Sequence, residues 1–209
     1  MSQIVLSPLD RIQARLVGPA LGLPDRLQVA ASGGTPLVID GLTLEPELQL
    51  LFAMRKLLPK PRFCDLQPAE SRLRIRADIA LLTGLPLPLA RVDDVSVAGA
   101  DGALRARRYV PHGFQAPGPC LVYYHGGGWT IGDLETHDQT CRFLAARAGV
   151  TVISVDCRLA PEHPFPAPVD DSLAAFAHIH AHATDHGIDP DRIAVGGDSA
   201  GGQIGRAHV

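Results

Sequence analysis

The chain has 209 residues, 46% hydrophobic and 20% charged, and its 19 Lys+Arg and 22 Asp+Glu leave a net charge of −3. This composition excludes a disordered chain, collagen and a coiled coil, and the scattered basic residues argue against a nucleic-acid partner. No apolar run approaches the roughly 18 residues that cross a bilayer, and the N-terminus lacks the pattern of a signal peptide, so we expect a cytoplasmic protein without a membrane span.

The N-terminal part of the chain predicts short helices. Residues 1–41 mix apolar patches with proline and glycine, so helices there should be brief. From Pro46 to Leu58 apolar residues recur near helical spacing, and a second helical stretch runs from Pro68 to about Leu82. Two helices are therefore expected before any strand.

The pattern changes to strands at Val92. Segments 92–97 and 104–110 are predicted to pair as a hairpin, because the turn-forming sequence AGADG joins them. The apolar runs 120–124 and 150–155 are typical of strands covered on both faces in a parallel sheet. This part of the chain should therefore form a sheet.

Helical segments alternate with these later strands. A connecting helix is predicted around residues 141–148, and another at 169–184 precedes a strand at 192–196. Such alternation predicts an α/β protein with a doubly wound sheet.

A GxSxG motif follows that last strand, in the sequence GDSAGG at 197–202. A strand that turns sharply into a helix holds its central residue in a strained conformation, and flanking glycines leave room for close approach. The helix N-terminus would point the Ala200 N–H at a carbonyl oxygen that becomes negative during attack. The motif therefore predicts Ser199 as a nucleophile.

A second glycine motif, HGGGW, occupies residues 125–129 after an apolar strand. Three successive glycines cost backbone entropy, which is reasonable where bare N–H groups must face a ligand. A phosphate-binding loop is an alternative, but neither GxGxxG nor GxxxxGK[ST] is present. We interpret the segment as half of an oxyanion hole.

Together with the segment DCRLAPEHPFPA at 156–167, these two motifs resemble the bacterial hormone-sensitive-lipase-like esterases of the α/β-hydrolase fold. The resemblance covers about residues 38–203, with one departure at Cys157, where the family usually has tyrosine. It implies a mostly parallel twisted sheet with flanking helices and an N-terminal helical cap. Residues 1–90 would form the cap region, and residues 91–203 the N-terminal part of the hydrolase core.

The resemblance also assigns roles to residues. It implies that Ser199 attacks a small-molecule acyl ester, that Trp129 lines the acyl pocket, and that the oxyanion hole involves Gly127, Gly128 and Ala200 with Gly126 in support. We expect no cofactor and no metal. His178, His182 and His186 recur at i, i+4 and i+8, but no carboxylate or cysteine completes a zinc site, so we expect that stripe to face solvent.

Several other residues have simpler interpretations. Asp198 is expected to stabilise the turn by a hydrogen bond, because a neighbour of Ser199 in sequence cannot orient a base that contacts the serine. His125 is expected to support the glycine loop. The four cysteines show no metal or disulfide spacing, so we expect reduced, buried thiols.

A triad acid and histidine are not evident. Only ten residues follow Ser199, none is acidic, and their one histidine is His208. The ending IGRAHV, residues 204–209, matches what a common sequencing adapter encodes, so we expect a non-native tail and an inactive fragment without the last strands and helices. The alternative is a non-catalytic, hydrolase-like protein that binds small molecules.

Overall fold

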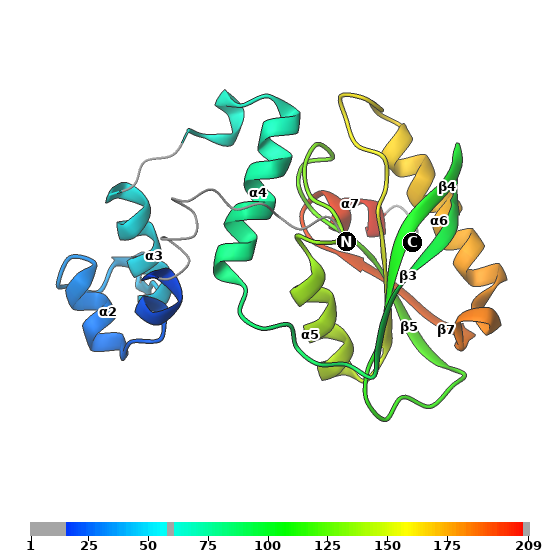
Figure 1. Ribbon diagram of the computed structural model, residues 1–209, viewed down its shortest axis with the longest axis horizontal. Helices are drawn as coiled ribbons and strands as arrows, with labels where there is room; N and C mark the ends of the chain where they lie inside the picture. Colours follow the sequence, from blue (N-terminus) through cyan, green and yellow to red (C-terminus); the bar gives the residue numbers. More distant parts are fainter. Residues whose placement is uncertain (1–15, 58–60, 207–209) are drawn as a thin grey trace. The chain divides into compact units, whose positions relative to one another are not determined.

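The structure, a computed structural model, describes residues 16–57 and 61–206 (Figure 1). The chain divides into two compact units, Met1–Gly84 and Leu85–Val209. Within the described residues, no helix combines the length and apolar character that a membrane crossing requires.

The first unit is largely helical. Its elements are α2 (Asp25–Ala31), α3 (Pro46–Leu57), the 3₁₀ turn η1 (Phe63–Asp65) and α4 (Pro68–Leu82). Helices α2 and α3 pack against each other. At the start of α4, the N–H of Gln67 donates a hydrogen bond to the Glu70 carboxylate at 3.1 Å, which satisfies a donor that the helix leaves unpaired. Both helices predicted for this region are confirmed.

A short hairpin in the first unit corrects one expectation. Strands β1 (Val38–Ile39) and β2 (Leu42–Thr43) pair antiparallel ahead of both predicted helices, so the prediction that no strand precedes them is wrong. Asp40 and Gly41 take positive φ angles of 51° and 79° between the strands. An Asp-Gly pair between apolar residues favours this turn, and the sequence carried that signal.

The second unit contains a five-stranded sheet in the order β3-β4-β6-β5-β7. The strands are β3 (Arg91–Gly99), β4 (Gly102–Val110), β5 (Gly118–Tyr124), β6 (Thr151–Val155) and β7 (Ile188–Gly197). Strand β5 pairs parallel with β6 and β7, whereas β4 pairs antiparallel with β3 and β6. The predicted hairpin is confirmed and forms an antiparallel edge, so the sheet is mixed.

Helices cover both faces of this sheet (Figure 1). They are α5 (Asp138–Ala148), α6 (Ala167–Ala181), the 3₁₀ turn η2 (Ala183–His186) and α7 (Ala200–Arg206). Alternate residues of β5 enter two separate cores, Val122 with α6 and Tyr123 with α5. Both faces of β5 are buried, which explains why its sequence is a continuous apolar run.

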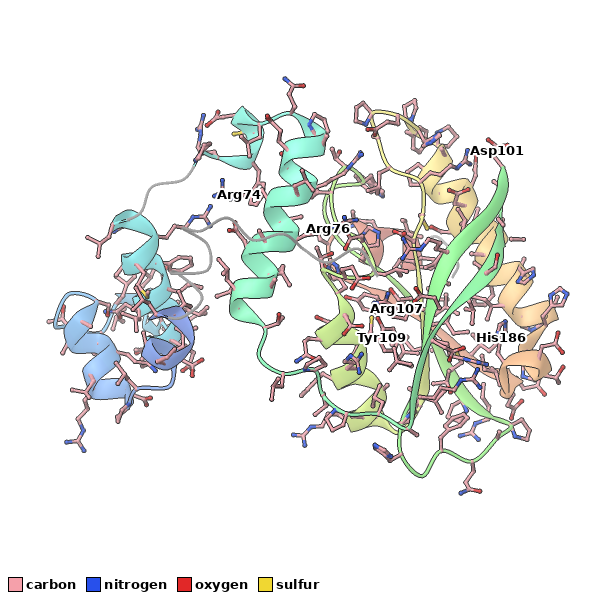
Figure 2. The ribbon with its side chains drawn as sticks, viewed as in Figure 1. Arg74, Arg76, Asp101, Arg107, Tyr109 and His186 are labelled. Atoms are coloured by element: carbon pink, nitrogen blue, oxygen red, sulfur yellow. The ribbon has the colours of Figure 1, made fainter. Side chains whose placement is uncertain are left out.

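A buried arginine fixes the start of α5. The Arg107 guanidinium on β4 forms ion pairs with Asp94 at 2.6 Å, Glu135 at 2.8 Å and Asp138 at 3.3 Å. The hydroxyl of Tyr109 also donates to Asp138 (Figure 2). Burial alone would lower the pKa of Arg107, but the hydrogen bonds that it donates to Glu135 and Asp94 raise it, so the group stays charged. The loop before α5 is therefore anchored to the sheet.

A buried carboxylate joins α6 to the β3–β4 turn. The Asp171 side chain is fully buried, accepts hydrogen bonds from the backbone and guanidinium of Arg158, and accepts another from the Ala100 N–H. Burial alone would raise the pKa of Asp171, but these hydrogen bonds hold it below its ordinary value. Arg158 also pairs with the exposed Asp101 at the hairpin tip (Figure 2).

Replacing Asp171 by alanine should lower the free energy of unfolding by about 3 kcal/mol, because it removes the buried acceptor of Arg158 and of the Ala100 N–H. Urea denaturation measures the change. The matched control is Asp101→Ala, which removes the other partner of Arg158, but from a side chain that is 83% exposed. It should have little effect, and equal losses in the two variants would contradict the assignment of Asp171 as the anchor.

Candidate active site

Ser199 lies in the sharp turn between β7 and α7. Its φ of 51° falls in the left-handed region, which serine seldom adopts and where its side chain strains the backbone. The residue is exposed, and no group in the described part of the chain hydrogen bonds to its hydroxyl. The strand-turn-helix predicted around Ser199 is therefore present.

The glycines around this turn are required by close packing. A Cβ on Gly197 or on Gly201 would collide with the carbonyl oxygen of Tyr124, the last residue of β5. Helix α7 therefore starts directly against the end of the neighbouring strand. Only glycine at these two positions allows that approach.

The loop after β5 presents backbone amides. Gly127 and Gly128 have φ angles of 118° and 61°, and a Cβ on Gly127 would collide with the carbonyl oxygen of Ile131. In residues 16–57 and 61–206, no acceptor is found for the N–H groups of Gly127, Gly128 and Ala200. Three of the predicted oxyanion-hole donors are thus available for a ligand.

The N–H of Gly126, unlike those three, has a hydrogen-bond acceptor within the protein. Its N–H donates a hydrogen bond to Oδ1 of Asp198 at 2.9 Å, so it is not available to a bound oxyanion. A Cβ on Gly126 would collide with that same carboxylate. Gly126 can therefore support the glycine loop, but its N–H cannot donate to an oxyanion.

Asp198 collects hydrogen bonds from outside its own turn. Its Oδ1 accepts the Tyr123 hydroxyl at 2.7 Å and lies 3.3 Å from Nε2 of His137. Burial alone would raise the pKa of Asp198, but Tyr123, His137 and the Gly126 N–H together lower it below its ordinary value. Burial also lowers the pKa of His137, against the opposing effect of Asp198. Sequence reasoning assigned Asp198 only a local role and missed Tyr123 and His137, for which no motif gives a signal.

His125 contacts the first glycine of the loop, as expected for a supporting residue. The ring is buried, and its Nδ1 lies 2.8 Å from the Gly126 carbonyl oxygen. Because a carbonyl only accepts, Nδ1 must carry the proton and donate it. This fixes the tautomer of His125 and leaves Nε2 as an acceptor.

Trp129 lines a small pocket beside the glycine loop. The pocket is bounded by Tyr124, His125, Trp129, Val155, Cys157, Leu159, Pro168 and Ile204. The Trp129 carbonyl accepts a hydrogen bond from the Ala160 N–H at 2.8 Å, which ties the loop to the segment after β6. Most of the lining is apolar.

The three buried cysteines do not supply a second nucleophile. Burial raises the pKa of Cys120, Cys141 and Cys157 to about 12, so these thiols stay protonated. Cys64 is exposed, which corrects the expectation that all four are buried. Across the described ranges, no group of three or more His, Cys, Asp or Glu side chains could hold a metal ion.

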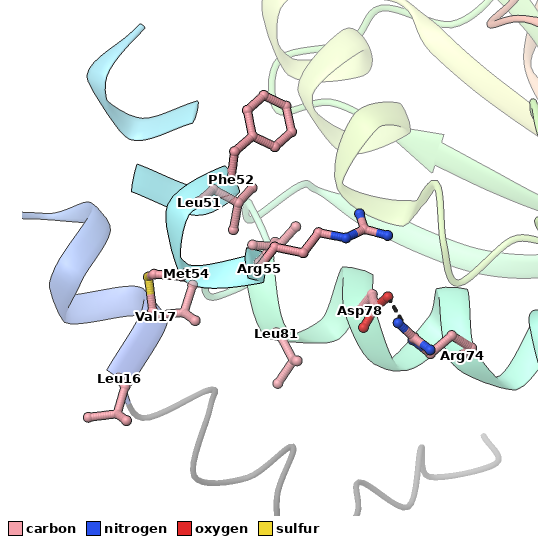
Figure 3. A pocket seen from close by; sticks show the side chains of 10 residues that line it. Leu16, Val17, Leu51, Phe52, Met54, Arg55, Arg74, Asp78 and Leu81 are labelled. Atoms are coloured by element: carbon pink, nitrogen blue, oxygen red, sulfur yellow. Dashed lines mark hydrogen bonds and ion pairs between the residues drawn. The ribbon is translucent and has the colours of Figure 1, made fainter. Parts of the chain in front are cut away.

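The first unit has a pocket of its own (Figure 3). It is lined by Leu16, Val17, Leu51, Phe52, Met54, Arg55, Arg74, Asp78, Leu81 and Leu82. Arg74 and Asp78 form an ion pair of 3.1 Å on its wall. The lining contains no serine, cysteine or histidine, so this pocket offers binding surface and no nucleophile.

Comparison with known proteins identifies the class of fold. Residues 121–209 match the family described as "alpha/beta hydrolase fold". The chain is similar to a hyperthermophilic esterase from Pyrobaculum calidifontis, with a TM-score of 0.72 and 39% identity over 78% of this chain and 51% of that one. It is also similar to an ester hydrolase from the metagenome of Lake Arreo, with a TM-score of 0.71 and 45% identity over 75% and 50% of the two chains. The second unit is an α/β-hydrolase domain.

Curated relatives of known activity are also similar to the chain. The chain is 45% identical over 186 residues to the carboxylic ester hydrolase LipN of Mycobacterium tuberculosis, an alignment that covers 87% of this chain and 48% of LipN. It is 50% identical over 120 residues to the carboxylesterase NlhH of the same organism, covering 56% of this chain and 37% of NlhH. The chain thus spans about half the length of these relatives, or less. Over the part that is shared, the chain is similar to esterases of the α/β-hydrolase fold.

The contact between α7 and β5 can be tested by stability. Gly201→Ala should destabilise the protein by about 1–3 kcal/mol, because the new methyl group meets the Tyr124 carbonyl oxygen. Gly205→Ala, in the same helix, meets Val195 at 3.5 Å and the Gly196 backbone at 3.9 Å, which are ordinary contacts, and should gain up to about 1 kcal/mol from helix propensity. Chemical denaturation compares the two, and a stabilised Gly201→Ala variant would contradict the packing.

Proposed function

We propose that this protein hydrolyses carboxylic esters through an acyl-enzyme on Ser199. The observation that carries the proposal is the strained Ser199 turn, which faces away from the core beside three amides without acceptors. An exposed hydroxyl and several unpaired N–H groups together suit attack on a carbonyl carbon. The esterase names of the relatives support the same chemistry.

The residues divide the reaction between them. Ser199 Oγ attacks the ester carbonyl carbon, and the carbonyl oxygen becomes negative as the tetrahedral intermediate forms. The N–H groups of Gly127, Gly128 and Ala200 would hold that oxygen, while Gly126 supports the loop. The alcohol then leaves, and water releases the acid from Ser199. A general base must take the serine proton, and none contacts the hydroxyl within the described residues.

The pocket beside Trp129 supports a choice of substrate. It is small and mostly apolar, so we propose small-molecule esters with a small or medium acyl group. Residues 1–90 would act as a cap region, and the division of the chain after Gly84 supports most of that range. The composition supports a cytoplasmic location, which cell fractionation would test.

Replacing Ser199 by alanine in the full-length gene product should abolish labelling by a fluorophosphonate probe. It should also reduce ester hydrolysis by about 10⁶-fold, the scale of nucleophile removal in serine hydrolases. Labelling is followed by intact-protein mass spectrometry, and hydrolysis with p-nitrophenyl esters.

The control for this test is Ser96→Ala, which removes an exposed serine from β3 and should leave both signals unchanged. Labelling that persists in Ser199→Ala would refute Ser199 as the nucleophile. A gene product that binds esters and is never labelled would instead favour the non-catalytic binding protein.

Replacing Trp129 by alanine should widen the acyl preference. The pocket would lose its largest wall, so kcat/KM for long-chain relative to short-chain p-nitrophenyl esters should rise about tenfold. The control is Phe143→Ala, which removes an exposed aromatic side chain of α5 outside this pocket. An unchanged ratio in Trp129→Ala would show that the acyl group binds elsewhere.

A further inference from the structure

One carboxylate oxygen is contacted by three groups from the two ends of the glycine loop. Oδ1 of Asp198 accepts hydrogen bonds from the Tyr123 hydroxyl at 2.7 Å and from the Gly126 N–H at 2.9 Å, and Nε2 of His137 lies 3.3 Å away. The reaction described above gives this carboxylate no part in bond making or breaking. Its contacts therefore need another explanation.

The three donors stand at both ends of the glycine loop. Tyr123 lies in β5, Gly126 opens the loop, and His137 immediately precedes α5. Asp198 itself precedes Ser199 in the chain. A single oxygen thus joins the start of the loop, the end of the loop and the nucleophile turn.

The fit around this oxygen leaves little room. Oδ2 of Asp198 occupies the space that a Cβ on Gly126 would need. The peptide of Gly126 is held further by His125, whose Nδ1–H donates to the Gly126 carbonyl oxygen at 2.8 Å. With its N–H and its carbonyl both engaged, Gly126 sets the direction in which the chain enters Gly127.

We propose that Asp198 is a positioning residue that fixes the amides of Gly127 and Gly128 relative to the hydroxyl of Ser199. The inference rests on the proposed function, because those amides matter only if an oxyanion forms there. A misplacement of about 1 Å costs an enzyme roughly 10²-fold in rate, so a rigid link between donor loop and nucleophile has a large effect.

The charge of Asp198 argues that its contribution is geometric. A carboxylate near a developing oxyanion repels it, so the electrostatic effect alone would slow the reaction. Asparagine keeps an oxygen that can accept from Tyr123 and Gly126 and removes the charge. Asp198→Asn should therefore retain the link that Asp198→Ala loses.

The test compares kcat, KM and the rate of fluorophosphonate labelling in the full-length gene product. Asp198→Ala should lower kcat and the labelling rate about 10²-fold, the cost of misplacing an oxyanion donor, with KM changed less than about threefold. Asp198→Asn should recover kcat to within about fivefold of the original protein. A purely structural role would lower the melting temperature without this split between kcat and KM.

Two further variants complete the test. Asp189→Ala removes a carboxylate from the opposite end of β7. That carboxylate accepts a hydrogen bond from the Asp191 N–H at 3.1 Å, and its removal should leave kcat unchanged. Tyr123→Phe removes only one of the three donors and should lower kcat by about 3–10-fold, which keeps the proposal testable if Asp198→Ala does not fold.

The two proposals fail in different ways. If Ser199→Ala shows neither labelling nor hydrolysis and Asp198→Ala keeps the original kcat, the positioning role is wrong and the esterase proposal stands. An Asp198→Asn variant as slow as Asp198→Ala would also overturn the positioning role, because charge would then be decisive. Labelling that survives Ser199→Ala would overturn the proposed function itself.

Discussion

The site depends on the parallel pairing of β5 with β7, in which Tyr124 lies opposite Gly197. Both strands end at the same edge of the sheet, so the glycine loop and the serine turn leave it side by side. The contact is so close that Gly197 and Gly201 have no room for a side chain against the Tyr124 carbonyl. The two motifs, which lie some 70 residues apart in sequence, therefore form one site because of a strand register.

Two polar clusters hold the loop that this register creates. Asp198 binds Gly126 at the beginning of the loop, and Arg107 binds Glu135 and Asp138 at its end. Strain of the kind seen at Ser199 costs roughly 1–3 kcal/mol and persists only where surrounding contacts determine the backbone. The hydrogen bonds of these clusters, each worth about 1 kcal/mol or more when charged, are large enough to maintain it.

The sequence predicts those parts of the site whose chemistry is local. The glycines at 127, 128, 197 and 201 are needed for the backbone conformation or close packing at those positions, and the surrounding motifs predict this. The strands and helices are predicted by the periodicity of apolar residues. Partners brought together by the fold leave no such signal. His137 and Tyr123 meet Asp198 only through the register of β5 and the start of α5, and the supporting place of Gly126 follows from that carboxylate. The Asp40–Gly41 turn, by contrast, has a local sequence signal. Its two strands have only two residues each, which is too short for an alternating pattern to predict them.

The described residues also separate two parts of the proposed chemistry. Groups that would bind and polarise a carbonyl come from the ends of β5 and β7, whereas the described residues place no base against Ser199. In serine hydrolases, binding and the oxyanion hole alone retain about 10³–10⁴-fold catalysis over water after the triad is removed. Asp198 belongs to the first part, since its contacts fix amides and no proton passes through it. Under the proposed function, the groups that would bind the carbonyl therefore come from this one sheet edge, whichever group accepts the proton.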